Sequence, residues 1–276
     1  MTPSPPWPRL GTQSFKDASN QWDELIVVAP LMVEIGQSRL LNYRTPGEDE
    51  ALVRGFLLTE GFITSPSEVA SIEIRPSEDG PEIDAAKVTL RGQPARHPPL
   101  FREIRPSCGA CGDDGVTRLR PLPLPVEPRS LTKEALVKAI HGLSIHQPLF
   151  KATGACHAAA LTDLQGMILV SAEDVGRHNA VDKVIGKFLS LPLLGGGQGG
   201  GLQADLSKCI LALSGRAGFE LIAKAIRAGI PAVVSVSATT SLSLRTAKDN
   251  ALTLAGFCRG NSVRVYHDPG RIRPSG

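Results

Sequence analysis

The clearest strand-to-helix junction in this chain is Glu173-Asp174-Val175-Gly176-Arg177-His178-Asn179-Ala180-Val181-Asp182-Lys183. It follows a run at 166–172 that predicts a strand, and it leads into a predicted helix over 180–189. Six ionisable side chains occupy its eleven positions, and turns of this kind are where α/β proteins gather functional groups. A solvated helix start is the alternative interpretation, although it would not need Gly176 and His178 between opposite charges. The junction predicts an α/β fold for this half of the chain.

The rest of the second half repeats the same alternation. Further strands are predicted at 158–162, 208–213, 232–236, 252–258 and 263–267, and helices from the cap Thr132 to Leu143 and over 219–228 and 242–250. This order is typical of a three-layer α/β domain. The prolines of Pro121-Leu122-Pro123-Leu124-Pro125, with Pro128, exclude a helix or a central strand and predict a stiff connector. We therefore assign residues 121–276 to this second domain.

A smaller α+β domain is predicted for residues 23–120. Short strands are expected at 24–28, 31–35, 39–43, 70–75 and 87–91, separated by turn residues. Between them, Pro46 and three acids open a helix whose apolar side chains share one face before Gly61 ends it. Residues 1–22 begin with four prolines and no apolar run, so we expect a disordered tail and not a signal peptide.

Composition limits the class of protein. The 276 residues, 42% of them hydrophobic, are enough to bury a substantial core. Thirty Lys and Arg against 27 Asp and Glu leave a net charge of +3, too small a surplus to favour nucleic acid as a partner. No stretch approaches the length that a membrane-spanning helix needs. The odd number of five dispersed cysteines fits reduced thiols better than a secreted disulfide framework, so we expect a cytoplasmic protein.

The segment Pro106-Ser107-Cys108-Gly109-Ala110-Cys111-Gly112 holds two thiols three residues apart, beside small residues that leave the backbone open to reagents. A thiolate attacks where a thiol does not, and positive charge favours the thiolate. Four arginines flank the pair: Arg102, Arg105, Arg118 and Arg120. The spacing alone leaves three interpretations open, namely half of a zinc site, redox disulfide chemistry and sulfur transfer.

Three more polar segments lie near predicted strand ends. Cys156-His157 precedes a small-residue strand, and its histidine is interpreted as a proton carrier, a ligand or a core residue. Ser214-Gly215-Arg216 can receive a phosphate through its backbone N–H groups and guanidinium, or form a simple tight turn. Gly256 to Ser262 offers glycines, an arginine and side-chain donors, or is an ordinary loop. Together, Arg177, Arg216 and Arg259 on turns of one sheet predict a pocket for a phosphorylated, anionic ligand.

Longer motifs resemble one known family, the formate dehydrogenase accessory sulfurtransferases, FdhD. In the first domain the similar stretches are Asn42-Tyr43-Arg44-Thr45-Pro46-Gly47, Gly55-Phe56-Leu57-Leu58-Thr59-Glu60-Gly61 and Ser107-Cys108-Gly109-Ala110-Cys111-Gly112. In the second domain they are Phe150 to Leu161, Glu173 to Gly186, Ser214-Gly215-Arg216 and Gly229-Ile230-Pro231. A set of motifs this extended is far more specific than a lone C-x-x-C. The chain departs from the family pattern at Ala155, Gly218 and Thr239, which affects the loops near the pocket more than the sulfur chemistry.

The resemblance implies both a fold and a function. The fold is a cytidine-deaminase-like three-layer α/β domain preceded by the smaller α+β domain, in a homodimer. Family members take sulfur as a persulfide from a cysteine desulfurase and deliver it to the bis-molybdopterin guanine dinucleotide cofactor of formate dehydrogenase. By this resemblance Cys108 is the persulfide carrier and Cys111 its neighbour. The implied cofactor-binding residues are Phe257, Cys258, Arg259, Gly260, Asn261 and Ser262, and Arg177, His178 and Arg216 join them from the turns described above. No tightly bound metal is expected.

Two other functions compete with sulfur transfer. A zinc deaminase uses H-x-E followed by P-C-x-x-C, but here His157 follows the cysteine pair and Ala159 stands where glutamate would be. A structural zinc held by Cys108, Cys111, Cys156 and His157 is an open alternative. The other is a non-catalytic chaperone, which binds the cofactor without moving sulfur and predicts that maturation survives the loss of Cys108.

Overall fold

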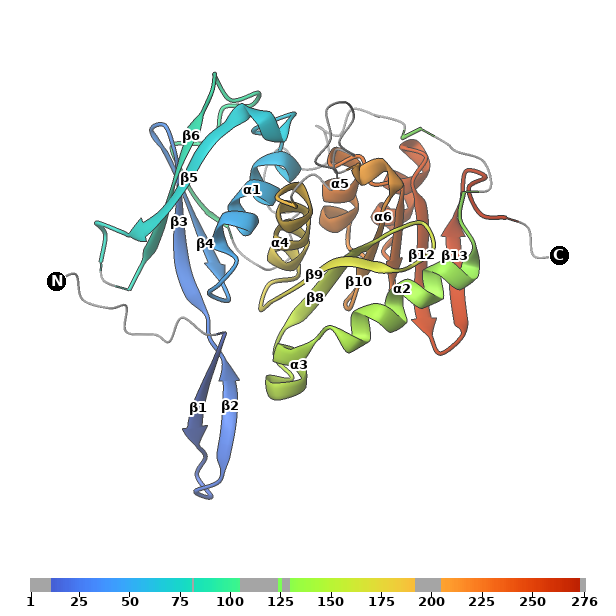
Figure 1. The fold of residues 1–276 in the computed structure, drawn as a ribbon, viewed down its shortest axis with the longest axis horizontal. Helices are drawn as coiled ribbons and strands as arrows, with labels where there is room; N and C mark the ends of the chain where they lie inside the picture. The colour runs from blue at the N-terminus through green and yellow to red at the C-terminus, as the bar shows by residue number, and fades with distance from the viewer. Residues whose placement is uncertain (1–10, 81, 105–123, 126–129, 192–204, 274–276) are drawn as a thin grey trace, which may run out of the picture.

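The computed structural model describes residues 11–80, 82–104, 124–125, 130–191 and 205–273. These residues form two lobes that lie side by side, with a β-hairpin projecting below the first lobe (Figure 1). The mixed α/β class predicted from the sequence is confirmed, and the described residues hold three separate sheets. None of the helices in these ranges is both long and apolar enough to cross a bilayer.

The first lobe is a five-stranded sheet with one helix against it. Its strands lie in the order β5 (Val69–Pro76), β6 (Asp84–Leu90), β3 (Ala29–Ile35), β4 (Ser38–Arg44) and β7 (Phe101–Ile104). Alternate residues of β3 are buried toward α1 (Asp49–Thr59), as the period of a strand with one core face requires. The helix predicted after Pro46 is confirmed. The edge strand β7 was not predicted, because its four residues carry no apolar alternation that stands out from a loop.

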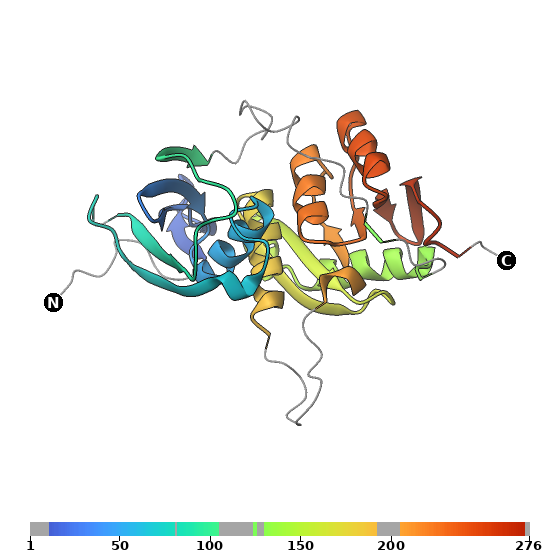
Figure 2. The same cartoon turned by 90° about the horizontal axis from the view of Figure 1, so that it is seen from above.

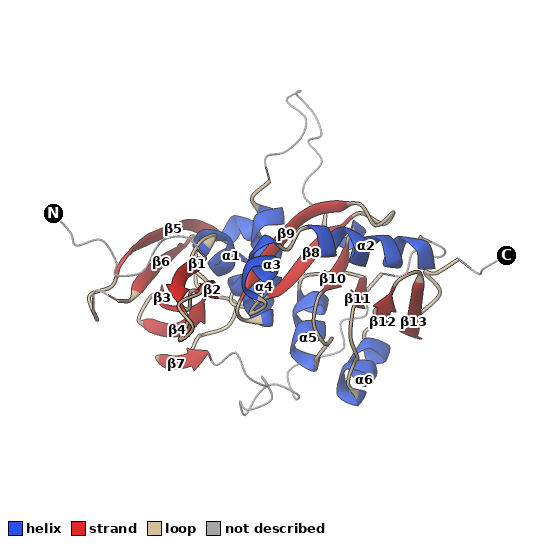
Figure 3. Ribbon diagram, turned by 90° about the horizontal axis from the view of Figure 1, so that it is seen from below, coloured by secondary structure: helices blue, strands red, loops and turns tan. Residues whose placement is uncertain are grey.

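The second lobe is a six-stranded mixed sheet with helices on both faces. Its strands lie in the order β13 (Ser262–His267), β12 (Thr253–Arg259), β11 (Ala232–Ser235), β10 (Ile210–Leu213), β8 (His157–Thr162) and β9 (Ile168–Asp174). α2 (Lys133–Ile145) covers one face, and α4 (Arg177–Leu189), α5 (Phe219–Arg227) and α6 (Ser241–Asp249) cover the other (Figure 3). The central strands are mostly apolar, because both of their faces are buried. Every strand and helix predicted for this half is confirmed to within three residues at each end.

The lobes pack through α1 and α4, which lie against each other at the centre of the molecule (Figure 2). The helices meet at two glycines. A Cβ atom on Gly55 would lie 1.9 Å from the carbonyl oxygen of Asp182, and one on Gly186 would lie 1.8 Å from that of Ala51. Only glycine permits backbones to approach this closely. Residues on both sides of the predicted domain boundary therefore share one core, while residues 120 and 121 themselves lie outside the described ranges.

Residues 12–22 correct the expectation of a disordered tail. Thr12–Lys16 forms β1 and pairs antiparallel with β2 (Trp22–Ile26) in a two-stranded sheet of its own. The turn between them is closed by the Asp17 carboxylate, which accepts hydrogen bonds from the backbone N–H groups of Ser19 and Gln21, both at 2.8 Å. Such an Asx turn is a local sequence signal for a hairpin. The prediction missed this signal because the prolines of the first ten residues indicated disorder for the whole segment. Those ten residues lie outside the described ranges.

Candidate functional site

The predicted basic turns gather at one edge of the six-stranded sheet. β10, β11 and β12 run parallel, so their carboxyl ends share an edge. β8 runs the other way, and its first residue, His157, pairs with Asp174 at the end of β9. The edge therefore collects His157, the Arg177 turn that follows β9, and the Gly215-Arg216 turn that follows β10. Arg177, the first residue of α4, and Arg216 therefore lie at the same edge of the sheet.

His157 lies where these turns meet. Burial lowers the pKa of its imidazole, and the positive charges of Arg177, His178 and Arg216 lower it further. Its ring packs on Gly215, where a Cβ atom would lie 3.2 Å from Nδ1. A neutral imidazole inside a group of cations indicates a local positive potential, which attracts an anionic ligand.

His178 and Glu220 form a second pair at the same edge. The Nε2 atom of His178 lies 3.9 Å from Oε2 of Glu220, too far for a hydrogen bond but close enough for an ion pair. This neighbour lowers the pKa of Glu220 to about 2, so the carboxylate is ionised. Within the described part of the chain, neither ring nitrogen of His178 has a hydrogen-bond partner, although both are buried. Buried polar atoms are costly to leave unpaired, so His178 fits a site that a ligand or water completes.

The absence of a side chain at Gly218 leaves room for the Glu220 carboxylate. A Cβ atom at position 218 would lie 2.9 Å from Oε2 of Glu220, so a larger residue would push the carboxylate away from its present position. This is one of the positions where the chain departs from the pattern of the family that it resembles. Glu220 itself was missed by the sequence analysis, because an acid in the first turn of a helix is also the ordinary partner of the helix dipole.

Several polar residues of the 173–183 segment are buried against the first lobe and do not face solvent. The Asp174 carboxylate accepts the backbone N–H of Thr45 at 3.0 Å and pairs with the Nζ atom of Lys183 at 2.8 Å, both side chains being nearly inaccessible. Lys183 also donates to the Thr45 carbonyl at 2.8 Å. The Nδ2 atom of Asn179 donates to the Tyr43 carbonyl at 2.8 Å. The solvated helix start is therefore wrong, because these charges are held in contacts between the lobes.

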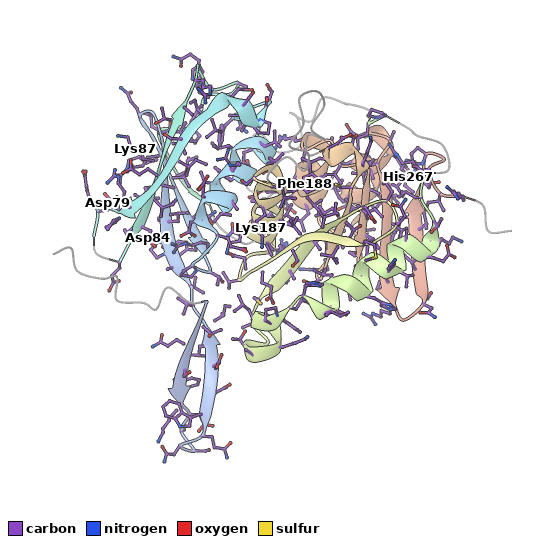
Figure 4. The ribbon with its side chains drawn as sticks, viewed as in Figure 1. Asp79, Asp84, Lys87, Lys187, Phe188 and His267 are labelled. Atoms are coloured by element: carbon purple, nitrogen blue, oxygen red, sulfur yellow. The ribbon has the colours of Figure 1, made fainter. Side chains whose placement is uncertain are left out.

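A second buried ion pair crosses the same boundary. The Nζ atom of Lys224 lies 2.9 Å from Oδ2 of Asp182, and it also donates to the Thr59 hydroxyl at 2.9 Å and to Glu60 at 3.0 Å. Lys187, labelled at the boundary in Figure 4, adds a more exposed pair with Glu48 of the first lobe. These contacts hold the turn that carries Arg177 and His178 in one position relative to the first lobe.

The last residues of β12 include a strained aromatic residue. Phe257 has φ of +47°, its side chain is 38% exposed, and the Arg264 guanidinium lies 5.4 Å from the centre of its ring. A positive φ is unfavourable for a bulky residue and occurs where the surroundings hold it. Cys258 differs from its neighbours, because its thiol is 1% exposed and lies in the core beneath α2. This residue can therefore offer a ligand only its backbone.

The remaining residues of the predicted binding stretch are exposed: Gly260 and Asn261 form the turn between β12 and β13, and Arg259 pairs with Ser262 across it. Arg259 is not brought to the His157 cluster. Three strand spacings separate β12 from β8 in the sheet order, a distance of about 14 Å. Arg177 and Arg216 therefore lie at one part of the edge and Arg259 at another, so a ligand that touches all three must be extended.

The sequence is similar to known proteins along nearly its whole length. A profile of the FdhD/NarQ family matches residues 29–273. The chain belongs to the FdhD/NarQ family. A sulfur carrier protein FdhD from Anaeromyxobacter dehalogenans strain 2CP-C is 40% identical over 267 residues, which cover 92% of this chain and 90% of that protein. One from Corynebacterium efficiens is 39% identical, covering 93% and 94%.

The fold of this FdhD/NarQ chain is also similar to a crystal structure assigned to a formate dehydrogenase accessory protein from Desulfotalea psychrophila. The TM-score is 0.70 over 95% of this chain and 98% of that one, at 22% sequence identity. At that identity the likeness concerns the fold alone. The family resemblance predicted from the motifs is confirmed by the profile and by the relatives.

The two cysteines central to the prediction, Cys108 and Cys111, lie outside the described residues of this FdhD/NarQ chain. Of the four zinc ligands in the alternative interpretation, only Cys156 and His157 are described. The Cys156 thiol contacts Oε1 of Glu173 at 3.4 Å, and burial together with that carboxylate raises its pKa to about 12. It is a neutral thiol at neutral pH. Among the described residues, no group of three or more His, Cys, Asp or Glu side chains is arranged to hold a metal.

Proposed function

We propose that this protein is a sulfurtransferase that carries persulfide sulfur on Cys108 from a cysteine desulfurase to the bis-molybdopterin guanine dinucleotide cofactor of formate dehydrogenase. The observation that carries this proposal is the 40% identity, over 92% of the chain, to a protein named sulfur carrier protein FdhD. The accessory-protein assignment of the similar crystal structure supports the choice of client.

Loading of the carrier is a thiol exchange. The Cys108 thiolate attacks the outer sulfur of a persulfide on the donor, the sulfur–sulfur bond of the donor breaks, and the donor cysteine leaves as a thiolate. The terminal proton stays on the transferred sulfur, so Cys108 becomes a persulfide with no external oxidant or reductant. Such exchange is fastest when the attacking thiol titrates near the ambient pH, and the arginines flanking the loop in the sequence favour that. Cys111 is the neighbouring thiol of the same loop.

The client cofactor is the substrate, and the sheet edge suits its phosphates. Arg177 and Arg216 supply positive charge, and a ring N–H of His178, for which the described residues supply no acceptor, can donate to an oxyanion. The exposed ring of Phe257 suits contact with a flat heterocycle, and the Arg259 turn extends the site along the edge. In this role the chain's residues bind and orient the cofactor, while the molybdenum is the acceptor of the sulfur.

Further parts of the proposal are a homodimeric assembly, a location in the cytoplasm and a cytidine-deaminase-like arrangement of the second lobe. The mixed six-stranded sheet, with α2 on one face and α4, α5 and α6 on the other, supports that arrangement.

Mass spectrometry tests the proposal. The purified protein is incubated with a cysteine desulfurase and cysteine, and Cys108 should gain the mass of one sulfur atom that a thiol reductant removes. Cys108→Ser should lose this signal and fail to mature formate dehydrogenase, while Cys111→Ser, the matched control on the same loop, should still be loaded at Cys108. Maturation by Cys108→Ser at the unaltered level would instead indicate a cofactor chaperone. Stoichiometric zinc on the purified protein, lost with Cys108, would indicate the zinc site.

A further inference from the structure

The β1–β2 hairpin, residues 12–26, is an arm that projects from the body of the molecule (Figure 1), where β2 contacts the short helix α3 (Pro148–Thr153). Its two strands form a separate sheet, and its base is tied to the body by the Val27 N–H to Gly11 carbonyl bond of 2.9 Å and by contact of Gly11 with Leu149. A two-stranded hairpin is marginally stable on its own in water. Residues 12–26 nevertheless form a complete hairpin, although none of them belongs to the hydrophobic core of either lobe.

The arm exposes large apolar side chains. Trp22 is 71% exposed and Leu25 is 50% exposed, against an ordinary preference of such residues for burial. The Nζ atom of Lys16 lies 5.2 Å from the centre of the Trp22 ring. Tryptophan is the residue most enriched among the energetic centres of protein interfaces. An exposed tryptophan on a projecting hairpin therefore indicates a surface that a protein partner covers.

The charge of the arm indicates the kind of partner. One lysine, Lys16, stands against Asp17, Asp23 and Glu24, so the arm carries −2 while the whole chain carries +3. The acidic character is local to this element. Two copies of the arm would repel each other, whereas a basic surface with an apolar pocket complements it.

The arm begins at the same end of the five-stranded sheet as the chain segment that leads to Cys108. The arm leads into β3 at Ala29, which pairs with Arg44 at the end of β4. β7 runs parallel to β4 and ends at Ile104 beside Asn42, so it ends at the same end of the five-stranded sheet. Two strand spacings, about 10 Å, separate β7 from β3. Cys108 follows Ile104 by four residues, which span at most about 14 Å. A protein seated on the arm is thus within reach of the carrier cysteine.

We propose that the arm is the docking element for the cysteine desulfurase that loads Cys108, with Trp22 entering an apolar pocket on a basic surface of that enzyme. This inference rests on the proposed sulfur-carrier function. It predicts that the arm controls recognition of the protein donor and leaves the reactivity of Cys108 unchanged.

Two donors separate docking from chemistry. The first is a cysteine desulfurase with cysteine, and the second is glutathione persulfide, which needs no protein contact. Two arm variants are compared with the unaltered chain, Trp22→Ala and the double change Asp23→Lys with Glu24→Lys. The double change Glu134→Lys with Asp249→Lys is the matched control, because it reverses two exposed charges on α2 and α6 of the second lobe. Sulfur on Cys108 is measured by mass spectrometry against donor concentration.

Both arm variants should need roughly tenfold or more of the desulfurase for half-maximal loading, and should be loaded by glutathione persulfide at the unaltered rate. The control should match the unaltered chain with both donors. Added salt should weaken loading of the unaltered chain by the desulfurase more than that of the charge-reversed arm. A matching thermal unfolding midpoint in Trp22→Ala checks that the body is intact.

Three results would overturn the inference. Unchanged loading of both arm variants by the desulfurase would remove the docking role. Equal loss with both donors would place the effect on Cys108 itself. A fall in the solution mass of the protein without desulfurase, seen by light scattering for the arm variants only, would assign the arm to contact between two copies of the chain. If the unaltered chain accepts sulfur from neither donor, the proposed function fails and the role of the arm fails with it.

Discussion

The close approach of α1 and α4 at Gly55 predicts the effect of adding one methyl group there. Replacing Gly55 by alanine places a Cβ atom 1.9 Å from the carbonyl oxygen of Asp182 and 2.7 Å from its carbonyl carbon. Both obstacles are backbone atoms of α4, which cannot rotate away as the end of a side chain can. To restore an ordinary contact, the two helices must separate by about 1.5 Å.

Two opposing effects decide the magnitude. Forced overpacking costs about 1–3 kcal/mol, and a backbone obstacle in a packed helix pair places Gly55→Ala at the upper end. Alanine in place of glycine inside a helix stabilises by about 1 kcal/mol. The expected net change is a loss of about 2 kcal/mol in the free energy of unfolding. Because the same helix pair positions the Arg177 turn, weaker anion binding should accompany the loss.

Urea denaturation followed by circular dichroism measures this change. Gly142→Ala is the matched control, since it is also a helical glycine, and its new methyl group meets only the Ile168 side chain, at 2.7 Å. That side chain can shift, so the control should lose less than about 1 kcal/mol, or gain. If Gly55→Ala is as stable as the control, or is more stable than the unaltered protein, the close helix contact is not a property of this fold.

Three further predictions concern Lys224, Glu220 and Cys156. Lys224→Met should lower the free energy of unfolding by about 3–5 kcal/mol, because it leaves the Asp182 carboxylate buried without its partner; urea titration of the variant measures this, and a loss below 1 kcal/mol would contradict it. The pKa of Glu220 is lowered to about 2 by His178, below its ordinary value near 4.3, so its contribution to stability is present above about pH 4.3 and is lost as the pH falls toward 2. The stability difference between Glu220→Gln and the unaltered protein should therefore shrink from pH 6 to pH 3, and a difference that grows on acidification would reverse the sign assigned here. Cys156, with a pKa of about 12, should resist iodoacetamide at pH 8 in the folded protein and react after unfolding; rapid labelling of the folded protein, seen by peptide mass spectrometry, would mean that the thiol is accessible and ionised.

Part of the site could be predicted from the sequence because its signals are local. A glycine, an arginine and a short apolar strand that stand together identify a turn at a strand end, so the positions of Arg177 and Arg216 followed from the order of the chain. Glu220 could not be identified in this way. Its role depends on the 3.9 Å approach to His178, a residue 42 positions earlier, and on the space left by Gly218. The burial of Cys258 was missed for a similar reason, since alternation along β12 sets its side chain against α2 while that of Phe257 is exposed.

By itself the sequence determined most of the segments that form strands and helices, the mixed α/β class and the family, because hydrophobic period, turn residues and motifs act over a few neighbouring positions. It also contained the charged segment 173–183 without indicating the partners of those charges. Only the tertiary structure decided that Asp174, Asp182 and Lys183 face the first lobe while Arg177 and His178 line the sheet edge. The reason is physical: a buried charge takes the partner that the packing of distant segments brings within about 3 Å, and no local pattern encodes that distance.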